Sequence, residues 1–300
     1  MSLDQKEIKN DAIKIVLSRK GFDSANGDCP SPIFDLKTIL SLPIPSSEDA
    51  LTYNDLRYGE ISYSELLHQL GSSVFEEHCH LDPDLNKRNP DVNVEDWKPA
   101  FGQVGPAQGY LSNKVNIGDI FLFFGSFRGV KKEGENYRYY KKSDFDHCEK
   151  GEISDFYKYS ELHVVYGYMQ VGRILKRKEE IEEYKWHPHA SEFYLNKKNN
   201  TLYIPTEKLS FLPNLSDLPG FGTLDFRLDR VLTAKDHSKA IWTMRDWLKP
   251  HNVCGNRQNS AKNQNFLYYA GIWQELVLKE SKKALDWAIS LISPESKNKR

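Results

Sequence analysis

The chain has 300 residues, of which 39% are hydrophobic and 28% are charged, with 41 basic and 42 acidic side chains. This near-neutral balance disfavours a protein that coats nucleic acid without regard to sequence, because such proteins carry a basic surplus. No apolar run approaches the roughly 20 residues of a membrane helix. The four scattered cysteines form neither a disulfide framework nor a zinc motif, so we expect a cytoplasmic protein with no membrane partner.

The N-terminal part of the chain alternates short apolar runs with polar loops. Residues 13–17 and 36–42 are predicted to be strands, the first leading into a long polar loop. Ser62 begins a capping box, which predicts a helix that ends at Gly71. Pro106 is typical of the first turn of another short helix.

Residues 120–124 form an unbroken apolar run, which predicts a strand covered on both faces. Its expected partner is 163–175, which is rich in β-branched and aromatic residues. Gly167 and Gly172 inside that run indicate a bulge, a sharp bend or a close approach. Between the two strands, 131–160 is almost wholly polar and predicts an insertion on the surface.

The C-terminal part is predicted to mix hairpins and helices. Residues 192–195 and 201–204 flank a polar turn and are predicted to form a hairpin. A short helix is expected over 238–248, and a strand over 274–278. Ser281 caps a final helix whose apolar residues recur at helical spacing. The fold class that follows is α+β, a strongly bent mixed β-sheet with peripheral helices.

A segment rich in histidine and aspartate offers possible metal ligands. His80, Asp82 and Asp84 stand at alternate positions, so an extended backbone would turn them to one side. A distant histidine, His187 or His189, would complete the two-histidine, one-carboxylate set of non-haem iron enzymes. These two histidines flank a proline and are also suited to proton transfer. The competing interpretation is a capped turn whose aspartates bond to local backbone, with ordinary surface histidines.

A second group of polar residues follows the first strand. Arg19, Lys20 and Asp23 offer two cations and a carboxylate beside a glycine, as phosphate or carboxylate recognition requires. The spacing fits neither a Walker loop nor a dinucleotide fingerprint. The alternative is a charged surface loop with no specific ligand.

A third group borders the central strand and is suited to a nucleobase. Gln103, Gln108 and Arg128 could read the edge of a base, while Tyr166 or Tyr168 could stack on it. The alternative is that the glutamines satisfy buried backbone groups and the tyrosines fill the core.

The ordered series of motifs in this chain resembles the nucleotide modification associated domain 3 family. The motifs are SRKGFD (18–23), CPSPI (29–33), SLPIPS (41–46), HLDPDL (80–85), FGQVGPAQ (101–108), GDIFLFFG (118–125), HVVYGYMQVG (163–172), HPHA (187–190) and QELVL (274–278). The resemblance covers about 13–292 of a single domain expected over 1–300. The strands at 118–124 and 163–174 are also similar to the paired strands of PUA-like and EVE-like barrels, which bind modified bases at the barrel mouth.

The family resemblance implies a role in bacterial or phage systems that modify DNA bases. The first hypothesis is therefore a pocket protein that binds a nucleotide or modified base, as a reader or as an enzyme. The second is a metal-dependent hydrolase or oxygenase that uses His80, Asp82 and Asp84 with His187 and His189. The third is a structural or interaction protein. The sequence names no cofactor and does not choose between free nucleotide and DNA.

Overall fold

The computed structural model of the protein describes residues 13–23, 26–74, 78–86, 97–146, 153–210, 217–255, 257 and 260–294. Its strands are β1 Ile15–Arg19, β2 Ser31–Phe34, β3 Thr38–Ile39, β4 Ile44–Pro45, β5 Arg57–Tyr58, β6 Ile61–Ser62, β7 Cys79–His80, β8 Phe101–Gln103, β9 Ile120–Glu133, β10 Asn136–Tyr139, β11 Leu162–Leu175, β12 Thr201–Pro205, β13 Phe221–Thr223, β14 Ile241–Thr243, β15 Ser260–Ala261, β16 Phe266–Tyr268 and β17 Glu275–Val277. Its α-helices are α1 Tyr63–Gln69, α2 Gly105–Leu111, α3 Phe156–Tyr159, α4 Lys178–Ile181, α5 Glu192–Leu195 and α6 Lys282–Ile292.

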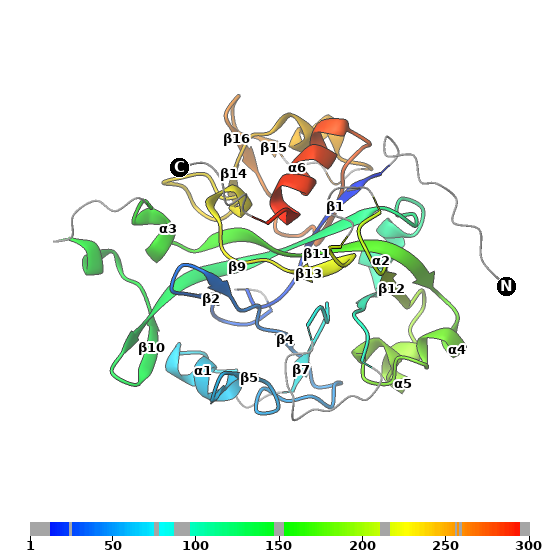
Figure 1. The fold of residues 1–300 in the computed structure, drawn as a ribbon, viewed down its shortest axis with the longest axis horizontal. Coiled ribbons are helices and arrows are strands. Elements are labelled where there is room, and N and C mark those ends of the chain that lie inside the picture. Colours follow the sequence, from blue (N-terminus) through cyan, green and yellow to red (C-terminus); the bar gives the residue numbers. More distant parts are fainter. Residues whose placement is uncertain are drawn as a thin grey trace.

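One large mixed sheet organises the molecule, in the order β17-β1-β9-β11-β12-β8. β1 and β2 both pair in parallel with β9, whereas β11 pairs with β9 antiparallel. The sheet is strongly curled into a half-barrel, which confirms the predicted α+β class with a bent mixed sheet. In Figure 1, β9 and β11 cross the centre, with α6 on one side and α1, β4 and β7 on the other.

The apolar run in β9 is buried on both faces, as its sequence predicted. Phe121 and Phe123 belong to one hydrophobic cluster, while Leu122 and Phe124 belong to another. α6 covers the second face and shares its cluster, to which it contributes Trp287 among others. Burial of alternate side chains against two different layers explains why this run shows no polar alternation.

The glycines of β11 mark close approaches and shifts of register. The pairing with β9 shifts between Val165 and Gly167, where an added Cβ would lie 2.7 Å from a methyl carbon of Leu85. At Gly172 an added Cβ would lie 2.8 Å from the Pro205 carbonyl oxygen, beside a second shift of register. Both positions confirm the interpretation of these glycines as bulges with close neighbours.

The helices with capping signals form where they were predicted. Ser62 Oγ accepts the backbone N–H of Glu65 at the start of α1, and Ser281 caps α6 in the same way. α2 carries Pro106 in its first turn. None of the described helices is both long enough and apolar enough to cross a bilayer.

Three predictions of secondary structure were wrong, two of them only in part, since β12 and β3 are strands where strands were predicted. Residues 192–195 form α5 rather than a hairpin strand, and β12 pairs instead with β11 and β8. Residues 238–248 contain β14, because Trp242 is completely buried against Tyr269 and tertiary packing overrides the helical spacing. Within 36–42 only β3 is a strand.

The polar segment 131–160 is only partly the surface insertion that the sequence predicted. β9 continues to Glu133 and forms a hairpin with β10, where Asn136 pairs with Glu133. Arg138 and Lys131 both form ion pairs with Asp144. These polar side chains therefore fit an exposed hairpin, and residues 147–152 lie outside the described part.

β1 leaves the sheet at Lys20, beside a glycine of β9. Lys20 N–H donates to the Phe124 carbonyl at 2.8 Å, and β2 resumes the parallel pairing at Phe127. A Cβ on Gly125 would lie 2.7 Å from the Lys20 carbonyl oxygen. Gly125 thus makes room for the turn that carries Lys20 toward the residues described next.

Candidate metal centre and its surroundings

Three of the predicted ligands converge, although they come from two segments that are far apart in the sequence. His80 ends β7, Asp82 follows it, and His189 lies in a one-turn 3-10 helix, Pro188–Ala190. One ligand atom from each lies within 4.8 Å of the other two. Each of the three donor types is a common ligand of divalent transition metals.

His80 is held by an acidic neighbour far away in the sequence. Its Nδ1 lies 2.8 Å from Asp49 Oδ2, and the carboxylate of Asp49 is buried. A carboxylate can only accept, so Nδ1 carries a proton and donates it to Asp49. Nε2 is then the ring nitrogen left for a metal. The hydroxyl of Tyr194 lies 3.3 Å from the same Nδ1. This arrangement is the carboxylate–histidine support that metal-binding imidazoles use.

His189 has an equivalent partner, an amide instead of a carboxylate. Its Nδ1 lies 2.6 Å from Asn200 Oδ1, and Asn200 Nδ2 donates to the His189 carbonyl at 2.9 Å. The second bond fixes the orientation of the amide, so Oδ1 must accept the Nδ1 proton. Nε2 of His189 is therefore also left unprotonated, and Tyr194 stacks on the ring at 4.7 Å.

Asp82 is positioned by two groups that leave the carboxylate charged. Its Oδ1 accepts the Gly102 N–H at 2.7 Å and lies 3.3 Å from Nε2 of the buried His187. His187 Nδ1 accepts the His189 N–H, so the proton of His187 is on Nε2. Burial alone would raise the pKa of Asp82, but the interaction with His187, and electrostatic interactions with Lys20 and with His189 in its protonated form, lower it to about 2.

The electrostatics keep the two kinds of ligand in the forms that bind metal. Burial lowers the pKa of His189 to about 3, so its imidazole is neutral at pH 7. Asp82 is ionised at the same pH. Metal binding requires neutral histidine and ionised carboxylate, and His189 and Asp82 meet these requirements at pH 7. With three protein ligands, the remaining coordination positions would be open to water or substrate.

Asp84 does not join this group. Its Oδ2 accepts the indole N–H of Trp97 at 2.8 Å, and its backbone pairs with Ala100 on both sides. Of the five predicted catalytic residues, the structure therefore brings together His80, Asp82 and His189, with His187 behind Asp82.

Lys20 and Gln103 meet at a buried glutamate. Glu275 Oε1 receives a hydrogen bond from Gln103 Nε2 at 2.7 Å and lies 3.2 Å from Lys20 Nζ. Ser18 Oγ donates to the same oxygen at 3.1 Å. Gln103 directly follows Gly102, so β8 connects this charged group to the metal ligands.

The other predicted ligand-binding residues have structural partners. Arg19 forms an ion pair with Asp23 at 2.7 Å. Gln108 is completely buried and accepts the Tyr203 hydroxyl, while Arg128 donates to the Tyr140 carbonyl. No contact within the described residues joins Gln108 or Arg128 to Lys20, so the structure brings only Gln103 of that group to the cation.

Tyr166 and Tyr168 lie in the two hydrophobic clusters of the sheet rather than beside the metal ligands. Tyr166 packs edge-on against Phe127, and the Tyr168 hydroxyl donates to the Pro219 carbonyl. Both are at most 5% exposed, so neither presents a free ring face.

Four residues of this neighbourhood were missed by sequence reasoning: Asp49, Tyr194, Asn200 and Glu275. Asp49 and Asn200 lie in irregular segments and Tyr194 in a single helical turn, where polar residues are ordinary. Glu275 did carry a signal, since an acidic residue inside the apolar run QELVL has to be paired if the run is buried.

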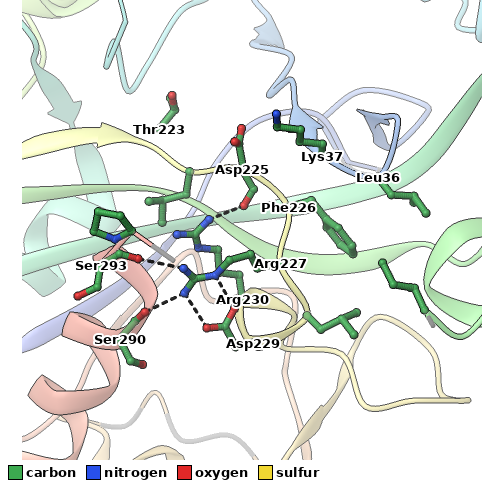
Figure 2. A pocket seen from close by; sticks show the side chains of 14 residues that line it. Leu36, Lys37, Thr223, Asp225, Phe226, Arg227, Asp229, Arg230, Ser290 and Ser293 are labelled. Atoms are coloured by element: carbon green, nitrogen blue, oxygen red, sulfur yellow. Dashed lines mark hydrogen bonds and ion pairs between the residues drawn. The ribbon is translucent and has the colours of Figure 1, made fainter. Parts of the chain in front are cut away.

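A large cavity lies away from the candidate metal ligands, and its two arginines bind backbone oxygens. It has a volume of about 1220 Å³ and is lined by Leu36, Phe226, Arg227, Arg230 and neighbouring residues. Figure 2 shows both arginines directed at backbone oxygens: Arg227 donates to Ser290 and Ser293 of the α6 end, and Arg230 to Asp225. These cations neutralise the C-terminal end of α6.

The chain was compared with known proteins. A family model described as nucleotide modification associated domain 3 matches residues 14–279, which is most of the chain. No curated protein matches the chain, and no solved structure does. The match confirms the resemblance expected from the ordered motifs.

Proposed function

Because the chain belongs to the nucleotide modification associated domain 3 family, we propose that it is a metal-dependent enzyme of a nucleotide-modification system. In this proposal His80, Asp82 and His189 hold one divalent ion. The observation that supports it is the convergence of three ligand atoms within 4.8 Å, with Asp82 ionised and His189 neutral at pH 7.

The outer contacts support a metal more strongly than a simple buried polar cluster. Both histidines donate Nδ1–H to an oxygen, which turns each Nε2 lone pair into an unused acceptor. Among the described residues no hydrogen bond to either Nε2 is found, and a cation between these acceptors and the carboxylate of Asp82 would satisfy all three. Ligands in a coordination shell lie roughly 3–3.5 Å apart, so an ion would draw these atoms slightly inward.

The ion would polarise a bound oxygen group of the substrate or activate a small co-substrate at its open positions. His187 and Gly102 hold the carboxylate of Asp82 in place, and Asp49 and Asn200 hold the two imidazoles. Hydrolysis and oxygenation both use a two-histidine, one-carboxylate set, with zinc and ferrous iron as their usual ions. The substrate class is a nucleotide or a nucleobase in DNA.

The test is metal content, measured by plasma mass spectrometry after saturation with manganese, zinc or ferrous iron and gel filtration. We expect one ion per chain in the wild type, and a loss in His80→Ala, Asp82→Ala and His189→Ala. His78→Ala is the matched control, because this neighbouring histidine is exposed and contacts the Ala50 carbonyl instead. Wild-type protein that retains no ion, and gains no thermal stability from any of the three, would contradict the proposal.

A second measurement connects the ion to the family's role. Metal-loaded protein is incubated with deoxynucleotides and with DNA, under air and with exclusion of oxygen, and the bases are analysed by mass spectrometry. We expect a metal-dependent change of mass that is absent in Asp82→Ala. An oxygen-dependent change would indicate an oxygenase and an oxygen-independent one a hydrolase, whereas an unchanged base in every condition would speak for a reader.

A further inference from the structure

Lys20 is a cation whose contacts lead to the strand that holds Asp82. Its ammonium lies over the ring of Phe101 at 4.5 Å, and the next residue, Gly102, donates to Asp82. The charge of Lys20 also acts on the carboxylate of Asp82. Lys20 is therefore a cation next to β8, the strand whose Gly102 holds the carboxylate of Asp82.

Within the described residues Lys20 has one carboxylate partner, Glu275, whose Oε1 has two other donors and whose Oε2 is buried without a hydrogen bond. Glu275 Oε1 accepts from Ser18 and Gln103 in addition to its 3.2 Å contact with Lys20. An ammonium has three N–H donors, and this contact uses one of them. If Lys20 turned to a ligand, Glu275 Oε1 would still keep two hydrogen bonds.

The lysine side chain is also in a position to reach a ligand. It is 11% exposed, whereas the side chain of Glu275 is completely buried. A compact charge on a flexible stem is suited to a phosphate or carboxylate group, which it meets as a point charge. The same residue type beside a metal is a recurrent way to hold an anion whose other end reaches the ion.

We propose that Lys20 binds an oxyanion group of the molecule that occupies the metal centre, either the phosphate of a nucleotide or the carboxylate of a small co-substrate. The inference rests on the proposed function, since it takes the metal centre as the place of reaction. Glu275 is then a positioning residue that holds the ammonium toward the centre before the ligand arrives.

The test is calorimetric titration of the full chain loaded with manganese. The probes are inorganic phosphate, a deoxynucleoside 5′-monophosphate with its uncharged nucleoside, and 2-oxoglutarate. In the wild type we expect at least one of the three anions to bind, and Lys20→Met to weaken it at least tenfold. Lys20→Arg should retain most of the affinity, because the charge remains.

The control is Lys131→Met, which also removes a lysine from an ion pair, with Asp144 at 2.9 Å on the β9–β10 hairpin. It should bind the anions as the wild type does. Removing Lys20 alone leaves the buried Glu275 without its cation, so Lys20→Met/Glu275→Gln, which removes both charges, serves where the single variant fails to fold.

The outcomes distinguish the nucleotide phosphate from the co-substrate carboxylate as the group that Lys20 binds, and they distinguish a failure of this inference from a failure of the proposed metal centre. Loss of the monophosphate alone assigns Lys20 to the nucleotide phosphate, and loss of 2-oxoglutarate alone assigns it to a co-substrate carboxylate. Unchanged anion affinities in Lys20→Met, or a wild type that binds none of the three, would overturn the inference. Manganese content is measured in the same samples, so a failure of the metal centre is seen independently of anion binding.

Discussion

Gly102 is the residue on which the position of His189 depends most closely. An added Cβ would lie 2.2 Å from His189 Cδ2 and 2.3 Å from Cγ, far inside contact distance. The same residue donates its N–H to Asp82. A single backbone position without a side chain thus supports two of the three candidate ligands.

Gly102→Ala should therefore displace His189 and weaken metal binding by at least tenfold, with a loss of about 1–3 kcal/mol in unfolding free energy. Calorimetric metal titration and urea unfolding measure the two effects. Gly109→Ala is the matched control, since its added Cβ would meet only Asn199 at 3.8 Å. In a helix that change should be neutral or stabilise by up to about 1 kcal/mol. Equal metal affinities in the two variants would contradict the placement of His189.

The ligand histidines could be proposed from the sequence because each lies in a short, recognisable motif. His80 and Asp82 are two residues apart, and His189 lies in a distinctive His-Pro-His segment. Their partners could not be proposed. Asp49 reaches His80 across 31 residues of sequence, and only the folded chain brings them together.

At the scale of elements, β9 is the central strand of the sheet and packs large side chains on both of its faces. Phe123 packs against the rings of Phe101 and Phe121, while Phe124 packs edge-on against Trp242 and Tyr269 on the other face. The two faces therefore bury large side chains against separate layers.

Phe123→Ala and Phe124→Ala should each lower the free energy of unfolding by about 3–5 kcal/mol, because each leaves a cavity in a different cluster. Lys132→Ala, at the exposed end of the same strand, should have little effect. Urea unfolding monitored by circular dichroism measures all three. If one of the phenylalanine variants had the wild-type midpoint, that face would not be a packed core.

Elements with local signals were predictable, and elements formed by tertiary contacts were not. α1 and α6 begin at serine caps that the sequence shows. β14 forms because Trp242 stacks on Tyr269 at 4.6 Å, which no local pattern encodes. α5 places Tyr194 against His189, only five residues away, although the sequence predicted a strand there.

At the scale of the whole molecule, the buried ligand group makes stability depend on pH. The pKa of His189 is about 3 in the folded chain, compared with about 6.5 for an ordinary histidine. Between these values the unfolded chain binds more protons than the folded chain does. The stability that depends on neutral His189 is therefore fully present above about pH 6.5 and is lost as the pH decreases toward 3.

Metal-free wild-type protein should accordingly lose stability between pH 7 and pH 5, and His189→Asn should lose about 2 kcal/mol less over that interval. Urea unfolding at the two pH values measures the difference. His78→Asn changes an exposed histidine and should behave as the wild type does. An identical loss in His189→Asn would show that this imidazole is not buried in its neutral form.

The central claim is that His80, Asp82 and His189 hold a single divalent ion, and locating that ion tests it most directly. Crystals of the manganese-saturated protein would give an anomalous signal for the metal alone. The account predicts one peak, at about 2.0–2.3 Å from Nε2 of both histidines and from a carboxylate oxygen of Asp82. A peak bound by other residues, or a saturated crystal with no peak between these three side chains, would contradict it.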